Sequence, residues 1–404
     1  MEGSTILNIN YLFATSISPV LPNIIHQSML PQMVTYPTPK SFLNTIAPYS
    51  MNTTTIPIPD SQDIPPFNSN CFQDEHNSHH PLGIVDQYVL LAELGQNHLY
   101  PVYLARSIFD TTSDPSNLVV LKAIPATDRL KSFENESNIF QLNSHKNLLK
   151  CIEIIKNARF FFNNPIQKSS ENKKHRPTQG YYNILVLKYH ANGDLLDYVK
   201  KRKLSENVAR YYFGQLLDAL EHLHEQGYCH RDLKIENVIV NQNYDLVLAD
   251  FGHSVKYKDQ HGERLFKDES CITTPGICPP EFHKGAGYKG VPMDIFALGK
   301  LLLIFITGFN PFKNTKQTDE TYSMILKGQW AAYWRVTSGW MRKKWLKPDC
   351  IGNDLKALLE SMLNPDPSKR PSIQQIRESA WFQKTRPATS DEVSIEMIRA
   401  KNSI

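Results

Sequence analysis

The sequence predicts an α+β fold with two lobes, a small strand-rich lobe followed by a larger helical one. Short apolar runs that look like strands begin at Tyr88 and include residues 118–121, and polar turns separate them. Between Ser205 and Gly227 the apolar residues recur every three or four positions, which is the spacing of one helix face. Because strands come first and helices dominate later, the elements do not alternate as they would around a parallel sheet.

Residues 1–85 differ in composition from the rest and are expected to form a mostly disordered tail. They hold 11 of the 26 prolines, and Lys40 is their only basic residue. Proline at this density blocks helix interiors and sheet ladders. We therefore expect a linker, with a short docking segment as the alternative.

The strand-like runs from Tyr88 onward predict a small sheet, and the periodic stretch after them predicts a long core helix. Ser205 is placed to cap the amino end of that helix, and Gly227 is placed to end it.

The composition of the 404-residue chain also limits the classes of function. Its net charge of +4 is too weak to indicate nucleic-acid binding, and no run of 18 apolar residues predicts a membrane span. The cysteines lack metal-ligand spacing, so we expect reduced thiols rather than a zinc site or disulfides. An intracellular protein is expected, cytoplasmic with the nucleus as the alternative.

Two motifs follow the predicted helix. Residues 230–237 read His-Arg-Asp-Leu-Lys-Ile-Glu-Asn, and Asp250-Phe251-Gly252 starts 18 residues after Asp232. At this spacing the motifs resemble those of the eukaryotic protein kinases. The resemblance implies a bilobal protein kinase fold over 88–384, with a β-rich N-lobe at 88–187, a helical C-lobe at 191–384 and a C-terminal extension at 385–404.

The resemblance implies ATP as phosphate donor and Mg²⁺ as cofactor, and it assigns a role to each catalytic residue. Asp232 would orient the substrate hydroxyl and accept its proton, and Lys234 would neutralise charge on the transferred phosphate. Asn237 and Asp250 would bind Mg²⁺, since this cation prefers oxygen ligands.

The same resemblance implies a nucleotide site. Lys122 would bind the α- and β-phosphates and pair with Glu136, with Glu134 as the alternative partner. Leu187 would be the gatekeeper before a hinge in which Lys188 and His190 meet adenine. The other candidates would contact the adenine ring or, for the last of them, ribose or a basic substrate residue: Val102, Val120, Ile239 and Asp194.

The glycine-rich loop departs from the family pattern. Only Gly95 of its three glycines is present, and Asn97 and Tyr100 occupy the other two positions. Tyr100 is expected to add bulk where the backbone should approach phosphate. This departure makes a pseudokinase scaffold the alternative function. A kinase of small molecules is a third hypothesis, which the complete peptide platform at 274–281 disfavours.

The activation segment runs from Asp250 to Glu281 by resemblance. Glu281 should form a buried ion pair with Arg370, and Asp294 should hold the backbone of the catalytic loop. Arg231 is expected to stay unpaired until a phosphate binds it, so phosphorylation is expected to switch on the enzyme. Ser270 is the first candidate for that phosphate and Thr273 the second; Glu269 could supply part of the ordering.

The serine/threonine class is implied by Lys234, and the nearest group in character is the calcium/calmodulin-dependent kinases. Protein substrates with an arginine before the target hydroxyl are expected to meet Glu236 and Asp194.

Two insertions have separate interpretations. Residues 156–176, which carry six bases, are expected to form a solvated loop, with a docking site as the alternative. Residues 327–348 hold four of the five tryptophans. Core packing explains most of these, and a regulatory partner binding at this region is the alternative.

Overall fold

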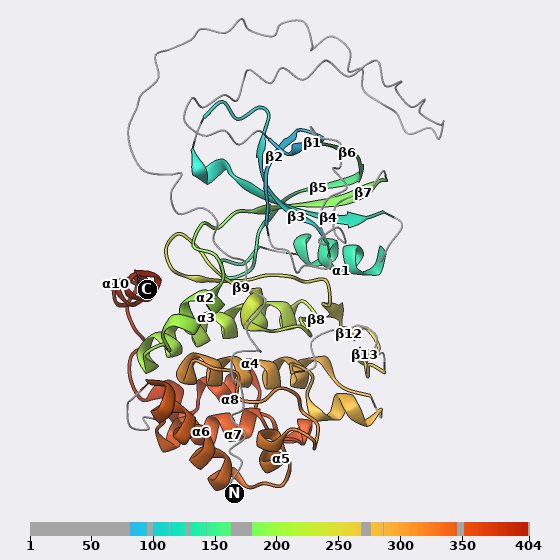
Figure 1. Ribbon diagram of the computed structural model, residues 1–404. Coiled ribbons are helices and arrows are strands. Elements are labelled where there is room, and N and C mark those ends of the chain that lie inside the picture. The colour runs from blue at the N-terminus through green and yellow to red at the C-terminus, as the bar shows by residue number, and fades with distance from the viewer. Residues whose placement is uncertain are drawn as a thin grey trace, which may run out of the picture. The chain divides into compact units, whose positions relative to one another are not determined.

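The computed structural model describes residues 81–94, 100–112, 114–126, 130–142, 144–162, 180–267, 276–285, 287–345 and 351–402. The described residues belong to one structural unit. Strands form its first part and helices its second, which gives the bilobal arrangement of a protein kinase fold (Figure 1). The predicted tail lies outside the described residues up to His80.

The first lobe is built on one sheet of seven strands, with the spatial order β5-β7-β4-β3-β2-β1-β6. All of its neighbouring strands are antiparallel. The strands are β1 (Gly83–Val85), β2 (Tyr88–Glu93), β3 (Val102–Ser107), β4 (Val119–Pro125), β5 (Cys151–Ala158), β6 (Phe160–Phe162) and β7 (Tyr182–Lys188).

The two edge strands of this sheet follow each other in the chain with only Arg159 between them. The sheet is therefore strongly curved, and Glu153 of β5 accepts hydrogen bonds from Gln87 (2.9 Å) and Tyr88 (2.8 Å) near the opposite edge. Phe160 packs against Tyr103 within the lobe's core, with ring centroids 5.6 Å apart.

This arrangement differs from two expectations. The solvated loop predicted at 156–176 begins instead as sheet, since residues 156–158 complete β5 and residues 160–162 form β6. Residues 83–85 also form a strand, although the disordered tail was expected to reach residue 85. The physical reason is that β1 and β6 pair with each other, and β1 also pairs with β2. The backbone N–H and C=O groups of the two short strands thereby find hydrogen-bond partners. Residues 163–179 of the insertion lie outside the described residues.

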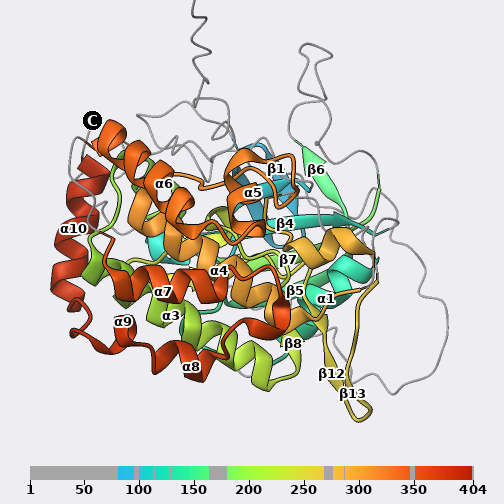
Figure 2. The ribbon, with the colours of Figure 1, turned by 90° about the horizontal axis from the view of Figure 1, so that it is seen from below.

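The second lobe surrounds a long apolar helix, α4 (Gly290–Thr307), which packs on α3 (Glu206–Glu225) and α7 (Asn353–Met362) (Figure 2). By length and hydropathy α4 could cross a membrane, but 89% of it is buried inside the protein, as befits a core helix. The other helices of this lobe are α2 (Leu195–Lys201), α5 (Glu320–Leu326), α6 (Trp330–Trp345), α8 (Ile373–Arg377), α9 (Ala380–Gln383) and α10 (Ser390–Asn402).

The long helix predicted from periodicity is confirmed. Ser205 caps α3 by accepting a hydrogen bond from the N–H of Val208 (3.4 Å). Gly227 follows the helix with a φ of +80°, a conformation that glycine adopts without strain.

The C-terminal extension is an integral part of this lobe. Helix α10 lies along α2 and buries Val393, Met397 and Ala400. Lys401 also donates to Asn192 (3.1 Å), which ties the end of the chain to the turn before α2.

Short strands and one-turn 3-10 helices complete the structure. They are η3 (Pro115–Asn117), β8 (Tyr228–Cys229), η4 (Ile235–Asn237), β9 (Val238–Val240), β10 (Leu246–Leu248), β11 (Val255–Lys256), β12 (Lys258–Asp259), β13 (Gly262–Glu263), η5 (Pro280–Lys284) and η6 (Pro367–Lys369).

Candidate active site

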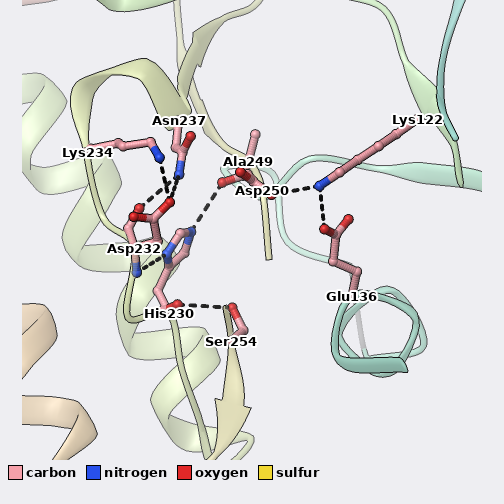
Figure 3. A network of polar contacts seen from close by, with 9 residues as sticks. All are labelled: Lys122, Glu136, His230, Asp232, Lys234, Asn237, Ala249, Asp250 and Ser254. Atoms are coloured by element: carbon pink, nitrogen blue, oxygen red, sulfur yellow. Dashed lines mark hydrogen bonds and ion pairs between the residues drawn. The ribbon is translucent and has the colours of Figure 1, made fainter. Parts of the chain in front are cut away.

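Two pairs of short strands bring the predicted motifs together. Strand β8 pairs with β11, and β9 pairs with β10. Residues 230–237 connect β8 to β9, and residues 249–254 connect β10 to β11, so both motifs emerge at the same place. His230 links the two motifs by hydrogen bonds. Its ring Nε2 lies 3.2 Å from the carbonyl oxygen of Ala249, and its own carbonyl accepts a hydrogen bond from the hydroxyl of Ser254 (3.4 Å; Figure 3).

Asp232 lies at the centre of this site and is 1% exposed. Its Oδ2 accepts hydrogen bonds from Lys234 Nζ (2.7 Å) and Asn237 Nδ2 (3.1 Å). Its Oδ1 is buried and has no hydrogen-bond partner among the described residues. A buried carboxylate oxygen without a donor is costly, so the arrangement suits a hydroxyl group that arrives with the substrate.

Asp294 of α4 anchors the backbone of the catalytic loop. Its carboxylate accepts from the backbone N–H groups of His230 (2.9 Å) and Arg231 (2.8 Å), as the resemblance implies. Burial by itself would raise the pKa of Asp294, but the hydrogen bond with His224 helps to hold it below its usual value. Arg231 and Asp250 adopt φ values of +65° and +63°, so both motifs hold a residue in the left-handed conformation that side chains other than glycine rarely adopt.

Lys122 of β4 contacts two carboxylates, Glu136 of helix α1 (Leu130–Phe140) and Asp250, which lies 2.7 Å away (Figure 3). Glu136 is thus its partner, in preference to Glu134. Burial opposes charge on all three groups. The two carboxylates nevertheless hold the pKa of Lys122 above its usual value, and Lys122 holds that of Asp250 below its own.

Gly252 allows this close approach. A Cβ there would come within 2.8 Å of both Glu136 Oε1 and Ser132 Oγ. Helix α1 can therefore lie against the Asp250 turn only because that position is glycine.

Asn237 and Asp250, the residues expected to bind Mg²⁺, can supply part of the ligands of a cation that takes the others from phosphate and water. Both hydrogen bonds from Asn237 to Asp232 use Nδ2, which turns its amide oxygen outward. No group of three or more His, Cys, Asp or Glu side chains suited to a metal occurs in the described part of the chain. A cation held by Asn237 and Asp250 would thus need further oxygen ligands, and Mg²⁺ typically takes them from water and substrate phosphates.

The structure also brings together the residues predicted to surround the adenine and ribose. Val102 pairs with Lys122, Val120 with Leu187, and Ile239 forms a bridge with Asp194. Val120 and Ile239, one from each lobe, both pack against the cluster that contains Leu187.

The predicted hinge begins at Lys188, the last residue of β7. The backbone N–H of Lys188 donates to the carbonyl of Lys150 (3.0 Å), and the carbonyl of His190 accepts from the backbone N–H of Gly193 (3.2 Å). Burial lowers the pKa of His190 to about 4, so its ring is neutral near pH 7.

Tyr100 does not behave as expected. Its side chain is 6% exposed and belongs to the hydrophobic cluster that includes Ile124 and Phe133. Its bulk is therefore accommodated in the core. Gly95 and Asn97 lie outside the described residues, so the rest of the loop stays a prediction.

Arg231 is another correction, because its guanidinium already has partners. It donates to the carbonyl of His253 (2.8 Å) and to the hydroxyl of Tyr288 (2.8 Å). The ring of Phe266 lies 5.2 Å from it, close enough for a cation–π contact. The expectation of an unpaired arginine is wrong, although Glu269, Ser270 and Thr273 themselves lie outside the described residues.

Comparison with known proteins decides the family. A model of the protein kinase domain matches residues 90–382. The chain belongs to the protein kinase family. The match spans both lobes and every motif described above.

Among its curated relatives are two plant kinases. CBL-interacting protein kinase 26 of Oryza sativa subsp. japonica is 29% identical over 303 residues, which cover 75% of this chain and 53% of the relative. CBL-interacting serine/threonine-protein kinase 20 of Arabidopsis thaliana is 29% identical over 301 residues, which cover 74% and 60%. The chain thus spans between about half and three-fifths of the length of these relatives.

Sequence reasoning did not find Tyr288 or Lys300. Tyr288 contacts Arg231 of the catalytic loop, and Lys300 contacts Gly276 of the activation segment. Tyr288 gives no sequence signal, because its contact with Arg231 spans 57 positions. Lys300 gives one, since it is the only charged residue in the apolar stretch from Ile295 to Ile306 of α4.

Proposed function

We propose that this protein kinase transfers the γ-phosphate of Mg-ATP to serine or threonine hydroxyls of other proteins. The observation that carries the proposal is Asp232, a buried carboxylate with one oxygen fixed by Lys234 and Asn237 and the other without a partner. This geometry leaves one oxygen to orient a hydroxyl and accept its proton.

The surrounding residues support the same reaction. Lys122, fixed by Glu136, points toward Asp250 and would bind phosphate oxygens of the nucleotide. When bound, Mg²⁺ would neutralise phosphate charge and fix the donor in place. Asn237 and Asp250 would hold it, while Lys234 would face the transferred group.

The completeness of this network argues against a pseudokinase scaffold. Lys122, Asp232, Asn237 and Asp250 are all present and lie in contact with one another or with a shared neighbour. The third hypothesis, a small-molecule kinase, does not require the Glu281 and Arg370 pair that secures the end of the peptide platform.

The test is phosphorylation of an array of serine, threonine and tyrosine peptides by the full chain with labelled ATP and Mg²⁺. Labelling of serine or threonine peptides is expected. Nucleotide binding without transfer would favour the scaffold, and transfer only to tyrosine would contradict the class.

The calcium/calmodulin-dependent group remains the proposed nearest relative in substrate choice. Asp194 caps α2 and is 7% exposed, and burial raises its pKa to about 6. Above that pH it carries a charge that, with exposed Glu236, suits an arginine before the target hydroxyl.

The contact between Tyr288 and Arg231 predicts activity that does not depend on a phosphate in the activation segment. Replacing Tyr288 with Phe removes one hydrogen bond to a buried guanidinium, which should lower kcat by roughly tenfold. Phosphatase-treated wild type should keep its turnover. If phosphatase silences the wild type while Tyr288→Phe has no effect, the arginine is ordered by phosphate instead.

The tryptophan-rich region is packed mainly as core, as expected. Trp334 is 6% exposed and donates to Glu360 (2.6 Å), and Trp345 donates to the carbonyl of Thr307 (2.7 Å). Trp340 is the most exposed of the four, at 37%. A partner here would therefore meet few exposed rings.

A shallow basic groove of about 410 Å³ lies between α6 and α7, and Ala331, Trp334, Arg335, Ser338, Arg342 and Lys356 line it. Arg335 and Arg342 are exposed, and neither forms an ion pair with a described carboxylate. Seven helical residues separate them by about 10 Å. We propose that this groove binds a protein segment with two acidic or phosphorylated side chains at a matching distance.

The charge-reversed variant Arg335→Glu/Arg342→Glu should bind such peptides at least tenfold more weakly. The probes are labelled helical peptides with two glutamates or phosphoserines seven residues apart, which lie on one helix face about 10 Å from each other. Lys327→Glu/Lys343→Glu changes the same charge outside the groove lining and should bind like wild type. Equal weakening in both variants would show that only net charge matters.

A further inference from the structure

Lys300 is a buried cation that the catalytic network does not use. It lies near the middle of α4 and is 6% exposed. Within the described residues no carboxylate forms an ion pair with it. A lysine in such a place costs free energy unless its ammonium group is hydrogen-bonded.

The hydrogen bonds of Lys300 go to two backbone carbonyls from different segments. One belongs to Gly276, the residue at which the described part of the activation segment resumes, and the other to Phe312 (3.3 Å), in the loop between α4 and α5. The ring of Phe312 also lies 4.7 Å from the ammonium. Lys300 therefore joins the activation segment to two parts of the helical lobe.

The segment after Gly276 is held from the same side. Thr315 donates to the carbonyl of Cys278 (2.6 Å), so the loop between α4 and α5 supports a second point. A Cβ at position 276 would lie 2.7 Å from the carbonyl oxygen of Lys313 and 2.9 Å from Lys300 Nζ. The glycine thus permits the close approach on which the lysine contact depends.

We propose that Lys300 is a positioning residue for the protein substrate, which fixes the carbonyl of Gly276 and with it the peptide platform up to Glu281. The proposal rests on the proposed kinase function. Lys300 acts through the backbone and touches neither nucleotide nor catalytic residues. Its loss should therefore weaken peptide binding without a matching effect on the nucleotide.

The charge of Lys300 gives a second readout. Burial lowers its pKa to about 8, against the opposing attraction of the Glu236 and Asp319 carboxylates, which face it from the catalytic loop and the start of α5. The thiol of Cys278 in the platform also faces it, and burial raises the pKa of that thiol, so it carries no charge between pH 7 and 9. Below the pKa of Lys300 the ammonium makes charge-assisted hydrogen bonds, and above it a neutral amine makes weaker ones. The peptide KM of the wild type should then rise severalfold between pH 7 and 9.

The experiment measures KM for an acetylated peptide without titratable side chains and KM for ATP, in wild type, Lys300→Met and Lys369→Met. In Lys300→Met we expect the peptide KM to rise about tenfold and to lose its pH dependence. We expect the ATP KM to change less than twofold. Lys369 is exposed and serves as the control for charge. It should match the wild type.

Parallel changes in both KM values, or an unchanged peptide KM, would overturn the proposal. If Lys300→Met does not fold, the wild-type pH profile decides, and a flat peptide KM overturns it. A wild type that transfers no phosphate refutes the kinase function instead, so the two failures are distinguishable.

Discussion

Replacing Asp232 with Asn should abolish most phosphoryl transfer while leaving ATP binding nearly intact. The amide cannot accept the proton of the substrate hydroxyl, and the loss of general base help is worth about 10²–10⁴-fold in rate. The change keeps the shape of a side chain whose Oδ2 accepts from Lys234 and Asn237. The measurement is kcat with a serine peptide, together with the dissociation constant of ATP.

Two variants sharpen this result. Asp250→Asn should weaken Mg-ATP binding as well as turnover, because it removes a proposed metal ligand and a partner of Lys122. Asp259→Asn changes an exposed carboxylate in β12 and should have no effect. If Asp232→Asn were as active as the wild type, Asp232 would not be the base.

The parts of the site that could be predicted from sequence lie within short motifs. Asp232, Lys234 and Asn237 occur in one loop, so their spacing alone brings them together. The pairing of Lys122 with Glu136 was implied by the resemblance to protein kinases, with Glu134 as the alternative, and the structure places Glu136 against the lysine. Local periodicity and capping likewise predicted α3 with its ends at Ser205 and Gly227.

What sequence could not predict depends on contacts between distant segments. Strand β6 forms because β1, some 75 residues earlier, offers it a free edge, and neither strand is marked by its own three residues. The same holds for the chemistry of Arg231. Its sequence neighbours suggest an arginine that awaits a phosphate, whereas Tyr288 and Phe266 surround it in space.

A large loss of stability is expected when the buried pair of Arg370 and Glu281 is broken. Arg370 donates two hydrogen bonds to the carboxylate of Glu281, at 2.6 and 2.7 Å. Its side chain is 1% exposed and that of Glu281 is 8% exposed. Arg370→Met would leave a buried carboxylate unpaired, which should lower the free energy of unfolding by about 3–5 kcal/mol.

Urea unfolding of two further variants tests whether the pair itself is responsible. Glu281→Gln combined with Arg370→Met removes the stranded charge, so the double variant should be more stable than Arg370→Met alone. Arg386→Met breaks an exposed pair with Glu392 and should cost at most about 1 kcal/mol. If Arg370→Met cost no more than Arg386→Met, the end of the activation segment would be held by its other contacts. The contact that the substitution leaves in place is the packing of Phe282 with Tyr288, whose ring centroids lie 5.3 Å apart.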